Sequence, residues 1–411
     1  MIYLIILLGL FFLTYVYDYR QFSRGRIVWL VVVLIVFILL GGLRYRIGTD
    51  TVNYIFDYRL VPPLDKLTSS YFSTTRYAVG YVVMTSFFKM FTNDFTAVQL
   101  FHAFVVNSVV GWFFYKNSRH VFFSLLLFFV LSYSLLVFQQ MRESLAVSFF
   151  LLAWPAFRDE KWIKWYILSC CAVMFHVSAG MMFVLPIFKL PVIRNLFVFG
   201  RRTWIIGLGV LVLGVFIQSV FFKYIQLFAV SDAIADRAAV YSVNRLSGSL
   251  LAVWGGAGII FNFLRYLVYP GLALICLIRT QQMKGDKLDE NSKKMEFMAL
   301  MSMYVALFTV GVAIWARYNN YFFFFSIIFI SNWVYSNIYM FGKWIRIRAV
   351  YWWMFFVPLL GLHFYVSYWG SVNKSGTLKS YMSYYPYSSW FDKTRDKDRE
   401  NCYSYQKTLG H

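Results

Sequence analysis

Apolar residues run along this chain in long stretches that are separated by short polar segments. Each stretch approaches the ~20 residues that an α-helix needs to cross a membrane. The pattern therefore predicts an all-α polytopic membrane protein with roughly twelve transmembrane helices. We place the spans at residues 1–17, 27–43, 77–91, 96–115, 120–138, 143–157, 161–188, 203–222, 257–278, 295–315, 320–340 and 349–367.

Basic residues in the loops predict the orientation of these spans. They gather in four loops, which contain Arg20, Arg24 and Arg26; Lys189, Arg194, Arg201 and Arg202; Lys284, Lys287, Lys293 and Lys294; and Lys343, Arg346 and Arg348. If the spans simply alternate, all four loops fall on one side, which the positive-inside rule makes cytoplasmic. The N-terminus, loop 44–76, loop 223–256, the corner at Arg317 and the C-terminal tail then lie outside.

Two further basic loops, 116–120 and 158–164, conflict with this scheme because simple alternation places them outside. The run 161–188 is also long for one span, and His176 interrupts it. Re-entrant or broken segments there and near 77–95 would turn both loops inward and bring Arg142 and His176 to the outer side. Broken helices at membrane depth are tolerated where they are buried in protein or line a wet cavity, so this alternative predicts a central cavity.

The composition supports a membrane protein and narrows the function. Hydrophobic residues make up 60% of the chain and charged residues only 14%, against about 25% charged residues in soluble domains. We expect a single integral membrane domain over 1–370 and a polar, solvated tail over 371–411. The net charge of +21 lies mostly in loops between apolar runs, which favours anchoring at the membrane surface over nucleic-acid binding. The four cysteines lack the spacing of metal ligands, so we expect no metal site.

Charged residues at the edge of apolar runs are the first functional candidates, because a charge there is costly without a partner or ligand. The stretch GGLRYRIGTDTVNY, residues 41–54, holds Arg44, Arg46 and Asp50 around the flexible Gly48. Guanidinium groups suit phosphate oxygens because they donate in a planar fork. This stretch is either a phosphate-binding cradle or an interfacial loop whose arginines reach toward water. Asp50 could also cap the N-terminus of a following helix.

Three other polar positions interrupt apolar runs. Arg142, in FQQMRESLAVSFF, has no acid three or four residues onward, so it needs an anion or a partner from another helix. His176, in FHVSAG, could bond a neighbouring helix, act as a base or donate to a ligand. Arg317, in IWARYNNYFF, could be an interfacial anchor or part of a site. Loop 223–256 could form a lid or a plain connection.

Nucleotide-binding and hydrolase motifs are missing from the sequence. It contains no Walker loop, dinucleotide fingerprint, HExxH or nucleophile elbow. We therefore expect no cofactor, and any chemistry must use a substrate that is already activated.

Five motifs in this order resemble the EpsG-like family of bacterial exopolysaccharide and O-antigen (Wzy-type) polymerases. They are GLRYRIGTDTVNY, RYAVGY (76–81), QQMRESLA (139–146), FHVSAG (175–180) and ARYNNY (316–321). The resemblance extends to about residue 340. The chain departs from the pattern at Tyr77-Ala78, where Tyr-Glu is expected, so a carboxylate is missing there.

The resemblance implies a multi-pass glycosyltransferase of the bacterial inner membrane, with a GT-C-like helical architecture similar in plan to O-antigen ligases. Such an enzyme joins polyprenyl-diphosphate-linked oligosaccharide repeat units into exopolysaccharide, capsule or O-antigen at the external face. It needs neither a metal nor a nucleotide sugar. Its expected partners are membrane lipid, a flippase and a chain-length regulator.

This chemistry assigns roles to the polar candidates. Arginines would stabilise the charge that grows on the leaving diphosphate, with Arg142 as the catalytic one. His176 is favoured as the base over Asp50, because a neutral imidazole tolerates burial better than an unpaired carboxylate. The full set comprises the diphosphate ligands Arg44, Arg46, Arg142 and Arg317, the candidate bases His176 and Asp50, and the sugar-stacking residues Tyr45, Tyr54, Tyr71 and Tyr77.

Other functions fit the same residues. A ligase would move a finished glycan in one large transfer, whereas a polymerase produces a ladder. A flippase or transporter for the lipid-linked sugar would make no covalent product. A membrane acyltransferase that uses His176 would transfer acyl groups.

Overall fold

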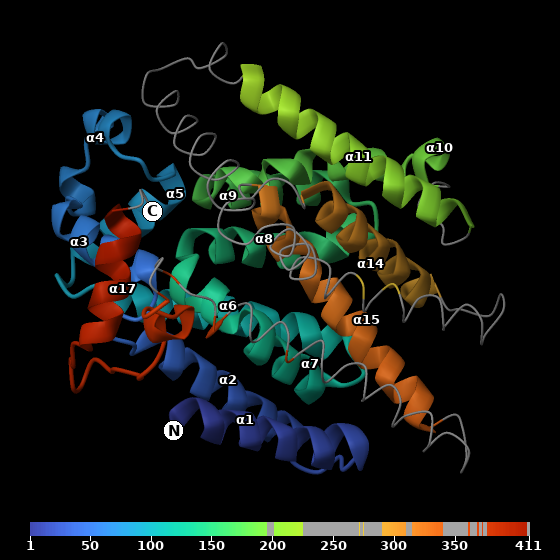
Figure 1. The fold of residues 1–411 in the computed structure, drawn as a ribbon, viewed down its shortest axis with the longest axis horizontal. Coiled ribbons are helices and arrows are strands. Elements are labelled where there is room, and N and C mark those ends of the chain that lie inside the picture. Colours follow the sequence, from blue (N-terminus) through green and yellow to red (C-terminus); the bar gives the residue numbers. More distant parts are fainter. Residues whose placement is uncertain are drawn as a thin grey trace. The chain divides into compact units, whose positions relative to one another are not determined.

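The computed structural model describes residues 1–194, 201–224, 290–309, 315–339 and 376–408, with a few isolated positions between 271 and 372. The described residues form helices and turns and contain no β-strand (Figure 1), which confirms the all-α prediction. The chain divides into two compact units: Met1–Leu190 with Ser371–Tyr405, and Pro191–Gly370 with Gln406–His411. The predicted spans 257–278 and 349–367 and the predicted lid, loop 223–256, lie outside the described residues apart from positions 223, 224, 271, 274 and 361.

The first unit carries most of the predicted site. Its helices are α1 Ile2–Leu13, η1 Thr14–Tyr19, α2 Arg26–Gly42, α3 Thr49–Leu60, η2 Leu64–Lys66, α4 Ser69–Thr74, α5 Val79–Lys89, α6 Thr96–Asn117, α7 Val121–Phe128, η3 Phe129–Gln139, α8 Met141–Arg158, α9 Trp162–Phe175, η4 Val177–Phe183, η5 Leu185–Lys189, η10 Ser380–Ser383 and α17 Lys397–Thr408. Helix α2 packs against α6, and α8 packs against both α6 and α9.

Membrane-length helices are present in this unit. Three continuous helical segments among the described residues are long and apolar enough to cross a membrane: Ile2–Tyr19, Thr96–Asn117 and Val121–Gln139. Shorter apolar helices include Arg26–Gly42 and Trp162–Phe175. The chain is therefore a membrane protein, and the total of roughly twelve spans stays a prediction.

Helix α2 shows how its sequence separates a packed face from a face that can meet lipid. Leu30, Val33 and Phe37 are buried, whereas Val28 and Ile35 on the opposite face are 64% and 49% exposed. Spacings of three and four residues keep side chains on one face of a helix. Exposed aliphatic side chains are stable in hydrocarbon, so this arrangement suits a membrane rather than water.

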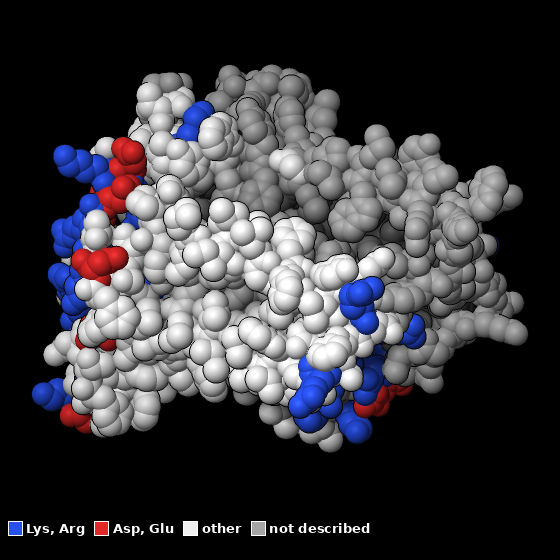
Figure 2. Space-filling model, turned by 90° about the horizontal axis from the view of Figure 1, so that it is seen from below, with Lys and Arg blue, Asp and Glu red and all other residues white. Residues whose placement is uncertain are grey.

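Charged residues mark two ends of the first unit. Figure 2 shows lysine, arginine, aspartate and glutamate gathered along the left edge and again at the lower right, with white, uncharged residues between the two groups. The end that holds residues 43–60, 75–95 and 138–142 is called the outer end, following the predicted orientation. The other end holds residues 18–26, 116–121 and 158–162 and is called the inner end.

The basic loop 116–120 lies at the inner end, next to the loop between α1 and α2. Arg26 bonds Asp18 at 3.4 Å and the carbonyl of Arg119 at 3.0 Å, and the amide of Phe123 donates to Asp18 at 2.7 Å. Simple alternation placed this loop outside, and that scheme is wrong. The alternative with broken segments accounts for the observed position.

The predicted span 77–91 does not cross the membrane. This explains why loop 116–120 lies at the inner end. Helix α5 has only 11 residues, or about 16 Å, roughly half the hydrocarbon thickness. Both of its ends lie at the outer end. Lys89 at its C-terminus donates to the carbonyl of Tyr58 at 3.0 Å, and the Tyr58 hydroxyl donates to the carbonyl of Thr92 at 2.8 Å. Helix α6 therefore starts from the outer end.

The predicted span 161–188 is also not one helix. Helix α9 stops at Phe175, and the chain turns back at His176 into the 3₁₀ segments η4 and η5. The two arms touch along their length, where the Trp165 indole donates to the carbonyl of Met182 at 3.0 Å. Lys189 pairs with Glu160 at 3.5 Å, so the start and the end of this hairpin lie together at the inner end.

This topology predicts that Asn117→Cys and Lys161→Cys do not react with a membrane-impermeant maleimide added outside intact cells. The residues lie at the inner end, so both should react only after permeabilisation. The four native cysteines would first be replaced, and Asp65→Cys, exposed in the outer segment, should react from outside. Reaction of both inner positions in intact cells would restore the simple alternating scheme.

The second unit contains α10 Pro191–Arg194, α11 Arg201–Tyr224, α14 Glu290–Thr309, η8 Trp315–Tyr318 and α15 Asn319–Tyr339. Helix α14 packs against α11 and α15. Gly214 allows α11 to lie close to α14, since a Cβ there would be 2.4 Å from the carbonyl oxygen of Phe308. Ser326 bonds Ser302 at 2.9 Å between α15 and α14.

Candidate active site at the outer end

The predicted cradle, residues 43–48, is held by the C-terminal segment. The amide of Tyr45 donates to the carbonyl of Ser388 at 2.8 Å, and the amide of Gly48 donates to the carbonyl of Ser383 at 3.2 Å. The amide of Trp390 donates back to Leu43 at 2.7 Å. The expectation of a solvated tail is therefore wrong, because residues 376–405 supply partners for backbone groups that a buried loop cannot leave unpaired.

Arg44 lies inside the protein. Its side chain is 1% exposed and donates to the carbonyl of Gly41, to Thr51 Oγ1 at 3.5 Å and to the carbonyl of Phe138 at 3.4 Å. Burial lowers the pKa of Arg44 to about 10, so the guanidinium remains charged at neutral pH. This placement favours a structural role, joining α2, α3 and η3, over the predicted contact with a diphosphate.

Arg46 forms a bidentate ion pair with Glu400 of α17. Its Nε donates to Oε1 at 2.7 Å and its second terminal nitrogen donates to Oε2 at 2.6 Å. The two side chains are 17% and 32% exposed, and the hydrogen bonds that Arg46 donates to Glu400 raise the pKa of Arg46. The fork geometry that would suit a phosphate is thus occupied by a carboxylate of the same chain.

We expect Glu400→Gln to loosen the C-terminal segment. The amide keeps a hydrogen-bonding group but loses the charge, which should cost about 1 kcal/mol for a partly exposed pair. Limited trypsinolysis at Lys393 to Lys397 should then proceed about fivefold faster. The matched control is Glu160→Gln, which removes an exposed pair at the inner end and should leave this cleavage unchanged. An equal rate in Glu400→Gln and wild type would contradict the stabilising role.

Asp50 lies in the first turn of α3 but is not its cap. The N-cap is Gly48, whose φ of 92° is a positive value that glycine adopts without strain. A Cβ at Gly48 would lie 2.6 Å from the carbonyl oxygen of Phe138, so the position has no room for a side chain. The capping role considered for Asp50 is therefore wrong, and its role as a base stays a prediction.

Arg142 reaches the outer end from the first turn of α8 and meets two tyrosines. Its Nε donates to the Tyr54 hydroxyl at 3.3 Å, and its guanidinium carbon lies 4.7 Å from the Tyr77 ring centre and 5.9 Å from that of Tyr54. It is partly buried, and no ion pair of the described residues includes it. Residues predicted to bind diphosphate and sugar therefore lie in direct contact.

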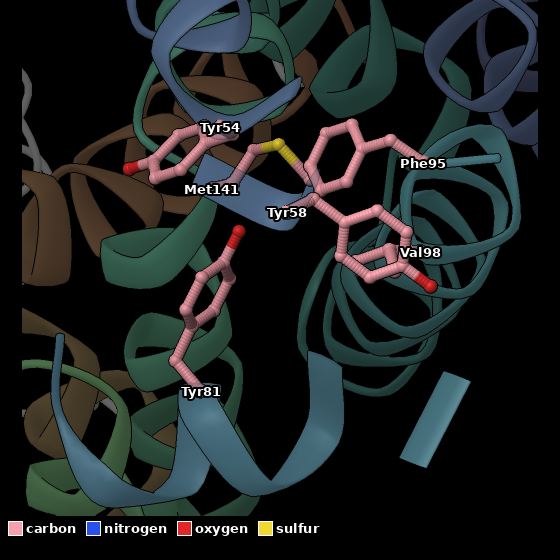
Figure 3. Close-up of a cluster of buried hydrophobic side chains, with 6 residues drawn as sticks. All are labelled: Tyr54, Tyr58, Tyr81, Phe95, Val98 and Met141. Carbon is pink, nitrogen blue, oxygen red and sulfur yellow. The ribbon is translucent and has the colours of Figure 1, made fainter. Parts of the chain in front are cut away.

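A cluster of buried side chains includes Tyr54, one of the two tyrosines that Arg142 contacts (Figure 3). It contains Tyr54 and Tyr58 of α3, Tyr81 of α5, Phe95, Val98 of α6 and Met141 of α8. Four helices thus hold Tyr54 in place, and Tyr77 packs against the same cluster. Rigid packing of this kind favours a preorganised site.

Asp57 completes the group on the other side of Tyr77. Its Oδ2 accepts a hydrogen bond from the Tyr77 hydroxyl and one from Arg76 at 2.6 Å. Arg76 also donates to the Tyr77 hydroxyl at 3.1 Å, and its guanidinium lies 5.2 Å from the ring centre. A carboxylate is therefore present beside Tyr77, although Ala78 provides none.

His176 lies at the turn between α9 and η4, and its ring caps η4. Nδ1 is 2.6 Å from Ser178 Oγ and accepts from the amide of Ser178 at 3.2 Å. The preceding Phe175 packs against the cluster of Figure 3. The turn thus lies at the outer end, as the broken-segment alternative requires, and the role of His176 as a base stays a prediction.

Arg317 belongs to the second unit. It lies in the η8 turn between α14 and α15, where Asn319 donates to Thr309 at 2.9 Å. Its predicted contact with the diphosphate stays a prediction. Tyr45 is partly buried in the loop that the C-terminal segment holds, and its stacking on a sugar is likewise a prediction.

Sequence reasoning missed Asp57, Arg76 and Glu400 as members of this end. One signal was available for Asp57: Asp50, Tyr54 and Asp57 follow i, i+4, i+7 spacing, which puts them on one face of a helix. Reading 44–76 as a loop hid that spacing. No local signal links Glu400 to Arg46, because 354 positions separate them.

Comparison with known proteins places the chain in one family. The family model described as EpsG family matches residues 26–389. No curated protein and no solved structure matches the chain.

Proposed function

The chain belongs to the EpsG family, and from that premise we propose that it polymerises polyprenyl-diphosphate-linked oligosaccharide repeat units at the external face of the bacterial inner membrane. The family match and the apolar helices support a membrane protein of exopolysaccharide biosynthesis. The donor, the acceptor and the polymerisation step are our proposal.

The observation that carries the proposal is Arg142 at the outer end. It is a partly buried cation outside the ion pairs of the described residues, and it contacts Tyr54 and Tyr77. A cation in such a place is costly unless an anion joins it. A lipid diphosphate would supply that anion at a site that lies beside membrane-length helices.

The proposed reaction uses the stored energy of the lipid-linked donor. A hydroxyl oxygen of the acceptor sugar attacks the anomeric carbon of the growing chain, and a new glycosidic bond forms. The bond from that carbon to the diphosphate oxygen breaks, and its electron pair stays on the departing polyprenyl diphosphate. Arg142 would stabilise the growing negative charge, while Tyr77, which is only partly buried, would offer an aromatic surface to a sugar.

A product assay on purified protein in nanodiscs tests the proposal. Synthetic polyprenyl-diphosphate oligosaccharide should yield a ladder spaced by one repeat unit, together with free polyprenyl diphosphate. Activity should persist with a chelator present and without nucleotide. A single large transfer would instead support a ligase, and transbilayer movement of the intact lipid without a product would support a flippase. Absence of product with cell-derived as well as synthetic substrate would overturn the proposal.

A further inference from the structure

Asp57 is held in a way that suits proton transfer. Its side chain is 24% exposed, so a substrate at the outer end could reach it. Both hydrogen bonds, from Arg76 and from Tyr77, end on Oδ2. Among the described residues no hydrogen bond to Oδ1 is formed, so one oxygen is anchored and the other can accept a proton.

The position of Asp57 relative to Arg142 is equally informative. Arg142 and Asp57 contact different parts of the Tyr77 side chain. Arg142 contacts its ring, and Asp57 accepts a hydrogen bond from its hydroxyl. Glycosyl transfer from a diphosphate needs a cation at the leaving group and a proton acceptor at the incoming hydroxyl, with a sugar between them. Tyr77 provides the separation and an aromatic surface for that sugar.

The competing bases are placed less well. The Nδ1 atom of His176 is engaged by the hydroxyl and the amide of Ser178, which caps η4. Asp50 lies two turns before Asp57 on α3, in the first turn, where a carboxylate stabilises the helix dipole. Asp57 is the carboxylate that contacts the tyrosine beside Arg142.

We propose that Asp57 is the catalytic base that accepts the proton of the acceptor hydroxyl, with Arg76 and Tyr77 as its positioning residues. This inference rests on the proposed glycosyl transfer. As the acceptor oxygen bonds to the anomeric carbon, its proton moves to Oδ1 and the bond to the diphosphate breaks. The protonated Asp57 then releases its proton to water, which restores the carboxylate.

The decisive experiment compares Asp57→Asn with wild type in the nanodisc assay. General-base removal should lower kcat by roughly 100-fold or more, while the affinity for polyprenyl diphosphate stays within about twofold. Asp65→Asn, in the same outer segment but exposed, should keep wild-type kcat. An Asp57→Asn protein with wild-type kcat would overturn the inference.

Two further variants keep the test open if Asp57→Asn does not assemble. Tyr77→Phe removes one bond to Oδ2 without changing charge, and it should lower kcat about tenfold with KM unchanged. Asp57→Glu keeps the carboxylate and should retain more activity than Asp57→Asn or Asp57→Ala. Unchanged kcat in Tyr77→Phe would contradict the positioning role. Failure of wild type to make any product would count against glycosyl transfer itself, a separate outcome from an active Asp57 variant.

Discussion

Replacing Arg142 with alanine should abolish chain extension while the protein still inserts and assembles. The side chain contributes two tyrosine contacts and one hydrogen bond at 3.3 Å, so its loss leaves the cluster of Figure 3 in place. Its charge, in contrast, would be the principal stabiliser of the leaving diphosphate. Loss of one such group costs roughly 100- to 1,000-fold in rate.

The measurement is the ladder assay together with binding of polyprenyl diphosphate. Arg142→Ala should lose both product and affinity, and Arg142→Lys should recover part of the affinity, because a point charge replaces the fork. The matched control is Arg59→Ala, which removes an exposed arginine of α3 at the same end and should leave both unchanged. An assembled Arg142→Ala protein that extends chains normally would exclude the leaving-group role.

Long apolar helices could be predicted from the sequence because lipid imposes a length. The continuous segments Thr96–Asn117 and Val121–Gln139 fall close to the predicted spans 96–115 and 120–138. The prediction of a span at 77–91 was wrong, although the composition of this stretch resembles that of a short span. The contacts of Lys89 and Thr92 with Tyr58 show that the stretch stays at the outer end. Such tertiary contacts cannot be predicted from composition.

The candidate site also contains residues that could be predicted from the sequence and residues that could not. Tyr54, Tyr77 and Arg142 could be predicted, because ionisable groups near membrane helices are costly unless they have a function. The structure brings these three residues together. Their neighbours were missed. The helical spacing of Asp50, Tyr54 and Asp57 was the one signal that pointed to Asp57. Arg76 resembles an ordinary loop charge, and Glu400 lies in a segment whose polarity indicates solvent rather than packing.

Arg44→Ala should destabilise the outer end more than any other substitution considered. The side chain is almost fully buried and bonds three groups from α2, α3 and the end of η3. Its removal leaves a large cavity and loses those bonds together. Substitutions of this kind cost about 3–5 kcal/mol.

The expected result is a melting temperature in detergent lower by several degrees, with faster proteolysis of the C-terminal segment. Arg44→Met, which keeps the length but not the charge, separates structure from binding. It should recover part of the packing but lose the three hydrogen bonds, and its folded fraction should bind polyprenyl diphosphate as wild type does. An Arg44→Met protein with wild-type stability and no affinity for the diphosphate would instead restore Arg44 to the binding site. The two arginines of the predicted cradle therefore have different roles because they differ in burial. The buried Arg44 links the helices of the outer end, whereas the partly exposed Arg46 could exchange Glu400 for a phosphate.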